Sequence, residues 1–493
     1  MQEEKSSYRQ IMKATSLFGG VQVFNILIAI VRSKFVAILL GPAGMGIVGL
    51  FQSTLGLVAS ITNFGLRTSA VKDIAEAVGT NNLKKVAIVV TVLRRLVWFT
   101  GLLGAVITVV FASWLSNLAF GNTNYTFAFI WLSITLLLNQ LSSGQSVLLQ
   151  GFRKLKLLAK SSVLGSFIGL LVTVPLYYFY GEKGIIPVII ISSVVSLVLT
   201  WCFSKKVTIE KVNVDITQTI KKGKQMMTLG FMLSLSGLIT VGAAYIVRIY
   251  ISNTGSLEDV GLYNAGFAII GTYVGLVFSA MATDYFPRLS GVAHNNAKAT
   301  VLINQQAEIG ILILAPILTV FLIFINWVVI ILYSTKFIPV NVMIHWAALG
   351  MYFKVVSWAI GFLLLAKGSS KLFFCSELIA NIYLLLFNIL GYKFFGLDGL
   401  GISFLIGYIL VLVQIYCIAK YYYNFNFNVV FYKIFGIQLA LGLCCFLIIK
   451  FVPIPWAYAF GVPFMLLSVW YSYRELDTRL NLKEIIINFR KRK

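Results

Sequence analysis

Charged residues are scarce in this sequence, and acidic residues are scarcer than basic ones. Only 11% of the 493 residues are Asp, Glu, Lys or Arg, against roughly 25% in an average soluble domain. Hydrophobic residues make up 59% of the chain, and the mean hydropathy is +0.90. So few charges cannot cover the surface of a soluble protein of this length. The composition therefore excludes a soluble globular protein and predicts an all-α protein that crosses a membrane many times.

Acidic residues number 16 against 40 basic ones, which gives a formal net charge of +24. In a soluble chain such an excess would suggest nucleic acid as a partner. In a membrane protein, basic loops on the cytoplasmic side are the usual orientation signal, and they also contact anionic lipid headgroups. We therefore expect membrane lipids as partners and no nucleic acid.

Histidine and cysteine are also rare, with two and five residues. We expect His294 in a loop and His345 at the start of a helix, and the cysteines lie in or beside apolar runs without the spacing of metal ligands. The glycines between 41 and 49 follow no strand, so they indicate close helix packing rather than a nucleotide-binding loop. We expect no cofactor and no metal.

Apolar runs of about 20 residues, the length that crosses a bilayer, recur along the whole chain. About fourteen membrane-spanning helices are predicted, near 17–40, 43–66, 86–113, 125–151, 161–180, 184–203, 226–251, 259–284, 302–325, 341–366, 372–392, 397–420, 430–450 and 454–473. If the N-terminus lies in the cytoplasm, the loops on the external side of the membrane contain as basic residues only Lys183, Lys336, Lys393 and Lys450. The 204–225 loop, on the cytoplasmic side, alone contains six lysines. This asymmetry predicts that both termini lie in the cytoplasm.

The two halves of the sequence repeat at a constant offset of 215 residues. Gly46, Lys156, Gly181 and Gly184 match Gly261, Lys371, Gly396 and Gly399, respectively. Each repeat would hold six helices, an even number, so the two halves should have the same orientation and be related by an axis along the membrane normal. We therefore predict an N-terminal lobe (1–215), a C-terminal lobe (216–425), two additional transmembrane helices (426–473) and a basic cytoplasmic tail (474–493).

Four cations interrupt apolar runs that are long enough to cross the membrane: Arg32, Lys34, Arg248 and Lys354. A charge at membrane depth costs from about 3 to over 10 kcal/mol, so it normally faces a polar cavity or the interior of the helix bundle. We predict that these four cations line a cavity for an anionic ligand. The alternative, for a cation near a helix end, is a side chain that extends to the interface.

Other polar side chains lie within the predicted spans. The amides Asn25, Gln52, Asn139 and Gln140 suit a ligand with hydroxyl groups, although hydrogen bonding between helices is the more frequent role of such residues. For Arg94 and Arg95 we favour the cytoplasmic headgroups over the cavity, because the true span could begin after them.

Five sequence segments occur in an order and at a spacing that resemble one family. They are LGPAGMGIVGLFQ (40–52), FGNTNY (120–125), LLQGFRK (148–154), TDYFPRLS (283–290), and TKF followed by LLLAKGSSKLFF (335–337 and 363–374). From about residue 14 to 420 the chain resembles the Wzx O-antigen translocases and the related enterobacterial common antigen flippase. They belong to a superfamily that also includes MATE multidrug exporters and peptidoglycan lipid flippases. Wzx proteins have twelve helices, so the pair after Lys420 is additional and resembles that of the peptidoglycan lipid flippases.

The resemblance implies a V-shaped bundle of two six-helix lobes, in the bacterial inner membrane, that exposes its substrate alternately to each side. The implied substrate is an undecaprenyl-pyrophosphate-linked oligosaccharide, such as an O-antigen repeat unit, which moves from the cytoplasmic to the periplasmic leaflet. Lysine and arginine in a water-filled cleft suit its diphosphate. Flipping breaks no bond, so we expect no catalytic residue and no enzyme activity. A polysaccharide polymerase and a chain-length regulator are the implied protein partners.

Three other functions fit parts of the pattern. The additional helix pair resembles that of flippases for the peptidoglycan precursor lipid. A MATE-like drug exporter would need buried acids for its cationic substrates, whereas the buried charges here are cations. A membrane glycosyltransferase or polymerase would need catalytic groups on large external loops, and the short external loops hold as acids only Glu182, Glu258, Asp259 and Asp398.

Three acids lie near or just inside helix ends: Asp284, Glu308 and Glu377. The resemblance suggests transport coupled to an ion gradient, and an acid at such a position could exchange a proton or pair with a cation of the cavity. Each is therefore a candidate for coupling. The alternative for each is an ordinary structural or surface ion pair.

Overall fold

The structure, a computed structural model, describes residues 2–80, 82–210 and 212–480, and these residues are almost entirely helical, without a β-strand. Their contacts divide the chain into two compact units, Met1–Gly261 and Leu262–Lys493. Residues 481–493 of the predicted basic tail lie outside the described residues. The lobe boundaries at 215 and 425 stay a prediction.

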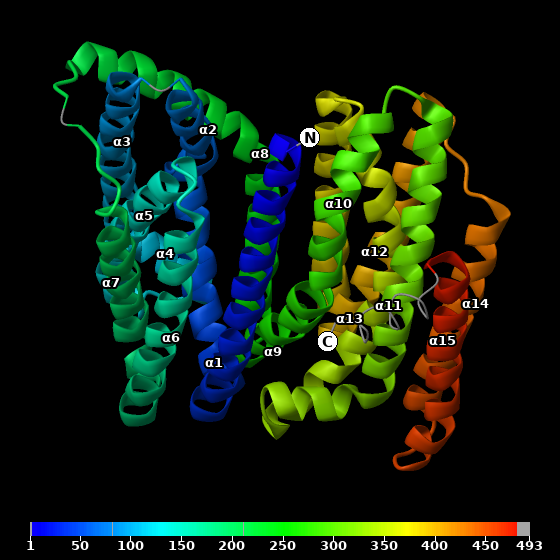
Figure 1. Ribbon diagram of the computed structural model, residues 1–493. Coiled ribbons are helices and arrows are strands. Elements are labelled where there is room, and N and C mark those ends of the chain that lie inside the picture. The colour runs from blue at the N-terminus through cyan, green and yellow to red at the C-terminus, as the bar shows by residue number, and fades with distance from the viewer. Residues whose placement is uncertain (1, 81, 211, 481–493) are drawn as a thin grey trace, which may run out of the picture. The chain divides into compact units, whose positions relative to one another are not determined.

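Figure 1 shows the order of the helices along the chain. Unit 1 contains α1 (Gln2–Thr62), α2 (Leu66–Gly79), α3 (Leu83–Val110), α4 (Ala112–Phe120), α5 (Thr126–Gly151), α6 (Leu155–Tyr180), α7 (Ile185–Ser204) and α8 (Ile216–Thr254). The unit boundary falls within α9 (Leu257–Phe267). Unit 2 contains α10 (Leu276–Val292), α11 (Asn296–Leu332), α12 (Asn341–Ala366), α13 (Ser370–Tyr423), α14 (Val429–Phe451) and α15 (Trp456–Leu480).

Eight helices in the described ranges are long and apolar enough to cross a membrane. Three of these stretches, Val21–Thr62, Leu155–Ser204 and Ser370–Tyr423, have 42, 50 and 54 residues, at least twice the roughly 20 that one crossing needs. A glycine interrupts the regular helix within each of them. The all-α membrane fold is therefore confirmed, whereas the count of fourteen helices is not, because the described residues form fifteen α-helices.

Two of these interruptions are 215 residues apart and have the same backbone conformation. Gly181 has φ 54° and ψ −132°, and Gly396 has φ 56° and ψ −134°. Both φ values lie in the left-handed region, which glycine adopts without a steric penalty. Arg153 and Gly368, again 215 residues apart, also have positive φ values, 54° and 71°. Residues that are 215 positions apart in the sequence therefore form turns with similar backbone conformations in the two halves of the chain.

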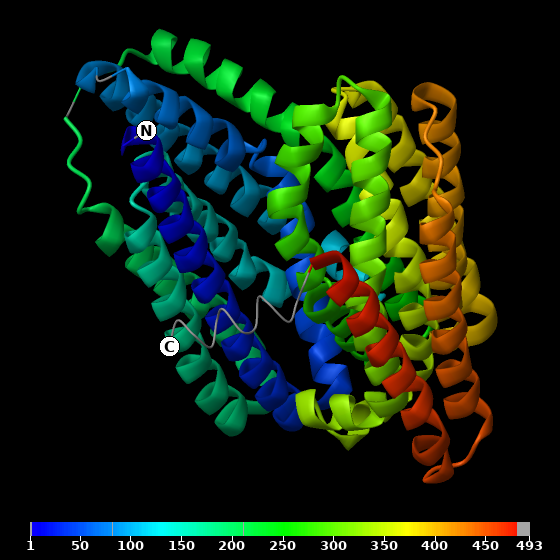
Figure 2. The ribbon, with the colours of Figure 1, turned by 45° about the vertical axis from the view of Figure 1, so that its right-hand side comes forward.

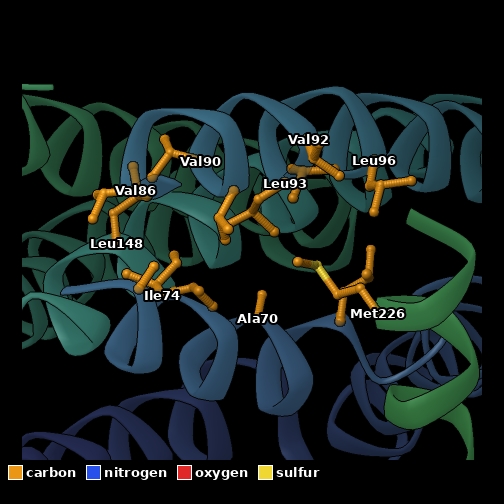
Figure 3. Close-up of a cluster of buried hydrophobic side chains, with 14 of the residues drawn as sticks. Ala70, Ile74, Val86, Val90, Val92, Leu93, Leu96, Leu148 and Met226 are labelled. Carbon is orange, nitrogen blue, oxygen red and sulfur yellow. The ribbon is translucent and has the colours of Figure 1, made fainter. Parts of the chain in front are cut away.

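Helices α2, α3 and α5 meet in a hydrophobic cluster in unit 1 (Figure 3). On α3, Val86, Val90 and Leu93 recur at intervals of four and three residues, which places them on one face of the helix. This face packs against Ala70 and Ile74 of α2. The same periodicity of apolar residues that predicts a helix from the sequence thus also determines which side of α3 is buried.

The first half of α8 lies across the ends of α2 and α3, as both ribbon views show (Figures 1 and 2). Its buried face includes Gly223, Met226 and Gly230, which recur at intervals of three and four. Gly230 lies against Phe64 and Gly65, in the turn between α1 and α2. This contact joins α8 to the α1–α2 turn within unit 1.

The turn at Gly65 has no space for a side chain. Its φ is 61°, and a Cβ atom there would overlap the carbonyl oxygen of Gly230. The left-handed conformation costs a residue with a Cβ about 1–2 kcal/mol, and overpacking typically adds about 1–3 kcal/mol. We expect Gly65→Ala to lower the melting temperature Tm of the detergent-purified protein by several degrees. Gly79→Ala, at an open position on α2, should leave it unchanged, and equal Tm values for the two variants would contradict the close contact.

Unit 2 is centred on α11 and α12, with α13 packed against α12 and with α14 and α15 packed against α11. Glu308 of α11 is buried, accepts a hydrogen bond from Asn428 Nδ2 at 3.0 Å, and pairs with Arg479 Nε of α15 at 3.3 Å. Removing one partner of a buried pair leaves an uncompensated charge. This polar contact therefore holds the two additional helices, α14 and α15, against α11.

Candidate functional site

A cavity of about 470 Å³ lies within unit 1 between α1, α2, α5 and α7. Most of its lining side chains carry a guanidinium, amide or hydroxyl group, and all of them are described. They are Arg32, Gln52, Leu55, Gly56, Ala59, Asn63, Arg67, Thr135, Leu136, Asn139, Gln140, Ser143, Ile189, Ser192 and Ser193. We call this site the polar cavity.

Helical spacing explains why residues far apart in the sequence reach one cavity. On α1, Gln52, Gly56 and Ala59 recur at intervals of four and three residues, and on α5 Thr135 and Asn139 are four residues apart. Residues at these spacings share one face of a helix. From Gln52 to Ala59 the lining follows roughly 10 Å of the α1 axis. One wall of the polar cavity therefore follows α1.

Two arginines give the polar cavity its charge. Arg32 comes from the part of α1 that precedes its interruption at Gly41, and Arg67 comes from the first turn of α2. None of the lining residues is acidic, and among the described residues no carboxylate forms an ion pair with either guanidinium. The N-terminus of α2 adds a partial positive charge next to Arg67. The polar cavity is thus electropositive and suits an anion.

Several lining side chains keep hydrogen-bonding groups for a ligand. Gln140 Nε2 donates to Thr100 Oγ1 at 2.9 Å, and Asn63 Oδ1 accepts from the backbone nitrogen of Gly65 at 2.8 Å. Each contact uses one end of an amide and leaves the other end for a ligand. The buried Oγ of Ser192 has no hydrogen-bond partner among the described residues. Donors and acceptors of this kind orient polar ligands in protein pockets.

The structure brings four of the predicted residues together in the polar cavity: Arg32, Gln52, Asn139 and Gln140. Asn25 is placed differently. Its Nδ2 donates to Ser162 and its Oδ1 accepts from Ser166, both on α6 and both at 2.9 Å. Asn25 therefore links two helices, which was the alternative role for an amide within a span.

The other predicted cations do not line the polar cavity. Lys34 follows Arg32 by two residues, which is about 200° around the helix. Arg248 on α8 donates from Nη1 to the carbonyl oxygen of Ala244 at 2.9 Å. Lys354 on α12, in unit 2, places Nζ 4.9 Å from the ring centre of Tyr408, a cation–π contact that stabilises a charge by roughly 0.5–2 kcal/mol. Substrate binding by these three residues stays a prediction.

The three candidate coupling acids have different surroundings. Asp284 forms an exposed ion pair with Arg288 at 3.1 Å, one helical turn away. Glu308 is the buried partner of Arg479. Glu377 is half-buried on α13. Ion coupling by any of them stays a prediction.

Six polar lining residues were not singled out in the sequence: Asn63, Arg67, Thr135, Ser143, Ser192 and Ser193. Arg67 follows the predicted end of the second span at residue 66, where a basic residue is usual at the membrane surface. The available signal was the glycine at position 65, which marks a turn. A turn there would have indicated that a new helix begins at Leu66 and returns Arg67 to the bundle.

Two known proteins of similar sequence carry the names of a flippase and of an O-antigen transporter. The chain is 22% identical over 358 residues to the lipid III flippase of Escherichia coli (strain K12), covering 72% of this chain and 85% of that protein. It is 25% identical over 412 residues to a protein of Shigella flexneri whose name proposes O-antigen transport, covering 80% of this chain and 94% of that protein.

Solved structures of similar fold are membrane transporters. The lipid II flippase MurJ in an inward closed conformation matches with a TM-score of 0.68 at 13% identity, covering 94% of this chain and 99% of that chain. An inward-facing multidrug resistance MATE family transporter of the MOP superfamily also matches with a TM-score of 0.68, at 15% identity, covering 81% of this chain and 94% of that chain. At these identities the likeness establishes the fold alone.

A family match covers more than half of the chain, from residue 35 to residue 342. The matching family is described as polysaccharide biosynthesis protein. Together with the eight apolar helices of the described ranges, the match identifies a multi-pass integral membrane protein. The chain belongs to the polysaccharide biosynthesis protein family.

Proposed function

We propose that this chain is a flippase that moves an undecaprenyl-pyrophosphate-linked oligosaccharide from the cytoplasmic to the periplasmic leaflet of the bacterial inner membrane by alternating access. The observation that carries the proposal is the polar cavity, in which Arg32 and Arg67 lie among amides and hydroxyls without a lining acid. The names of two relatives, a lipid III flippase and a proposed O-antigen transporter, support the same substrate class.

The diphosphate is the part of this substrate that is most costly to move through hydrocarbon, because a charge at membrane depth is strongly destabilised. In this proposal Arg67, in the first turn of α2, contacts the diphosphate as it enters the polar cavity, and Arg32 binds it further along. A guanidinium forms paired hydrogen bonds with phosphate oxygens. Gln52, Asn139 and Gln140 bind sugar hydroxyls. No bond is broken, so the cavity needs neither a nucleophile nor a general base, and the protein is not an enzyme.

The direction of transport follows from orientation in this proposal. Loops rich in lysine normally lie on the cytoplasmic side of the membrane. Placing both termini in the cytoplasm puts the lysine-rich 204–225 segment on that side. The substrate is assembled on that side and is released to the periplasm, where a polysaccharide polymerase and a chain-length regulator would use it. Lys34, Arg248 and Lys354 would add positive charge for the headgroup. Asp284, Glu308 and Glu377 are the candidates for coupling to an ion gradient.

Transport of the peptidoglycan precursor lipid is the second candidate. The lipid II flippase structure covers 94% of this chain, whereas the MATE transporter covers 81%. Both candidate substrates combine a diphosphate with sugars and a polyprenyl chain, so the polar cavity suits either. The lipid-linked oligosaccharide is favoured because the relatives matched by sequence, at 22–25% identity, carry such names.

Expression in two bacterial strains separates these candidates. One strain lacks a flippase for a lipid-linked surface oligosaccharide, and the other is depleted of the lipid II flippase. We expect this protein to restore surface glycan in the first strain and to leave growth of the second strain unrescued. Growth rescue of the second strain without surface glycan in the first would overturn the choice of substrate.

A further inference from the structure

A second cavity in unit 1 is apolar and lies between α3 and α8. It has a volume of about 690 Å³, and its walls include Leu96, Phe99 and Ile220. Arg95 of α3 and Lys224 of α8 also line it and are its two charged lining residues. We call this site the α3–α8 groove. Apolar walls beside two cations are complementary to a molecule with a hydrocarbon chain and an anionic head.

Arg95 is held in place at the α3–α8 groove by contacts to the first turn of α8 and to a residue that precedes it. Its Nη1 donates to the carbonyl oxygen of Val214 at 2.9 Å and to Thr219 Oγ1 at 2.6 Å. A guanidinium has five N–H donors, so others remain for a ligand. Asp215 is a fully exposed acid that interacts with Arg95. A single exposed carboxylate does not cancel the charge of Arg95 and Lys224 together.

The first half of α8 has the composition of a helix at a membrane surface. Ile216 and Ile220 are 71% and 64% exposed. Three lysines are exposed on the same stretch, Lys221, Lys222 and Lys224. Exposed apolar side chains beside basic ones are typical of helices that lie among lipid headgroups, with the apolar side chains in the acyl region and the ammonium groups at the phosphates. The groove thus borders a helix segment suited to anionic lipid.

We infer that the α3–α8 groove binds a phospholipid with an anionic headgroup. One acyl chain lies against the apolar wall, and the phosphate contacts Arg95 and Lys224. The volume lies within the range of about 300–1,000 Å³ that is usual for ligand sites. Basic pockets between transmembrane helices bind lipid headgroups in this way.

The isoprenoid tail of the transported substrate is the competing occupant. Phe64 lines the α3–α8 groove, and the preceding residue, Asn63, lines the polar cavity. A substrate whose diphosphate contacts Arg32 would bring only its uncharged tail to the groove. The groove has its own cations, Arg95 and Lys224, and this favours a ligand with its own phosphate. This inference is independent of which glycan is transported.

Photo-crosslinking of the full-length protein tests the inference. Phosphatidylglycerol and phosphatidylcholine, each with a diazirine on an acyl chain, are added to the detergent-purified protein, and labelled peptides are identified by mass spectrometry. We expect phosphatidylglycerol to label peptides that contain Phe99 and Ile220. The double variant Arg95→Gln/Lys224→Gln should need roughly tenfold more lipid for equal labelling. The control Lys221→Gln/Lys222→Gln removes the same charge from residues that do not line the groove and should lose much less labelling than the Arg95→Gln/Lys224→Gln variant.

A second variant keeps the test valid if loss of the Arg95 contacts disturbs folding. Lys224→Gln removes one exposed lysine and should weaken labelling with unchanged Tm. Equal labelling by phosphatidylglycerol and phosphatidylcholine would overturn the inference, and so would equal losses in the two double variants. Displacement of the label by polyprenyl phosphate, but not by unlabelled phosphatidylglycerol, would assign the groove to the substrate tail instead.

Discussion

Replacement of both Arg32 and Arg67 by glutamine is expected to abolish transport while the protein still folds in the membrane. Hydrogen bonds to a charged group contribute about 1.5–3 kcal/mol each, so loss of each arginine should weaken headgroup binding roughly tenfold to a hundredfold. Glutamine is uncharged and fits a polar cavity, so neither substitution places a new charge in the lining. Surface glycan in a complemented strain, compared at equal amounts of protein in the membrane, measures the effect.

Two control variants separate binding of the diphosphate from a general effect of charge. Arg94→Gln removes an exposed arginine of α3 that lines neither the polar cavity nor the α3–α8 groove, and it should transport like the wild type. Arg32→Lys keeps the charge but loses the paired hydrogen bonds, so it should retain part of the activity. Normal surface glycan in the double glutamine variant would show that the polar cavity does not bind the headgroup.

A larger side chain at Gly56 should block the polar cavity without unfolding the protein. Gly56 lines the cavity on α1, and a Cβ atom added there meets no atom within 4 Å. A leucine would therefore extend into empty space, and it favours the helix by about 1 kcal/mol relative to glycine. We expect Gly56→Leu to reduce surface glycan as strongly as loss of the two arginines, with Tm equal to or above that of the wild type.

Gly436→Leu is the matched control for this blocking variant. Gly436 lies on α14, is exposed, and also has no atom within 4 Å of an added Cβ. The same substitution there gives the same gain in helix propensity but does not enter the polar cavity, so transport should be normal. Full activity of Gly56→Leu would contradict a substrate path through the polar cavity. If both variants lost the same amount of surface glycan, the cause would be the introduction of leucine into a membrane helix and not the blocking of the polar cavity.

The helical membrane fold was predictable from the low charge content together with the recurring apolar runs of about 20 residues. Only 11% of the residues are charged. Where such a chain crosses a bilayer as helices, its backbone N–H and C=O groups form hydrogen bonds within each helix, because the lipid offers no partners. The repeat was predictable in part from glycines, since Gly181 and Gly396 are needed for the same left-handed turn. The number of helices was not, because the short helices α2 and α4 lie between the predicted spans and are not marked by an apolar run long enough to cross a membrane.

The candidate site was predictable where polar residues interrupt apolar runs. Arg32, Gln52, Asn139 and Gln140 are conspicuous in such runs, and helical periodicity then places them on the faces that line the polar cavity. Arg67 was not predictable in this way, since basic residues at membrane surfaces are common. The contact between Glu308 and Arg479 could not be predicted either. It joins helices α11 and α15, whose packing no local pattern specifies.

Transport by the purified protein in liposomes is the most direct test of the proposed headgroup binding. The vesicles carry either a fluorescent polyprenyl-diphosphate disaccharide or the same lipid with a neutral linkage, and a membrane-impermeant quencher reports which leaflet holds the label. We predict that the wild-type protein moves the diphosphate lipid between leaflets, that it leaves the neutral lipid in place, and that Arg32→Gln/Arg67→Gln moves neither. Movement of the neutral lipid at the same rate as the diphosphate lipid would contradict the proposal that the polar cavity recognises the diphosphate.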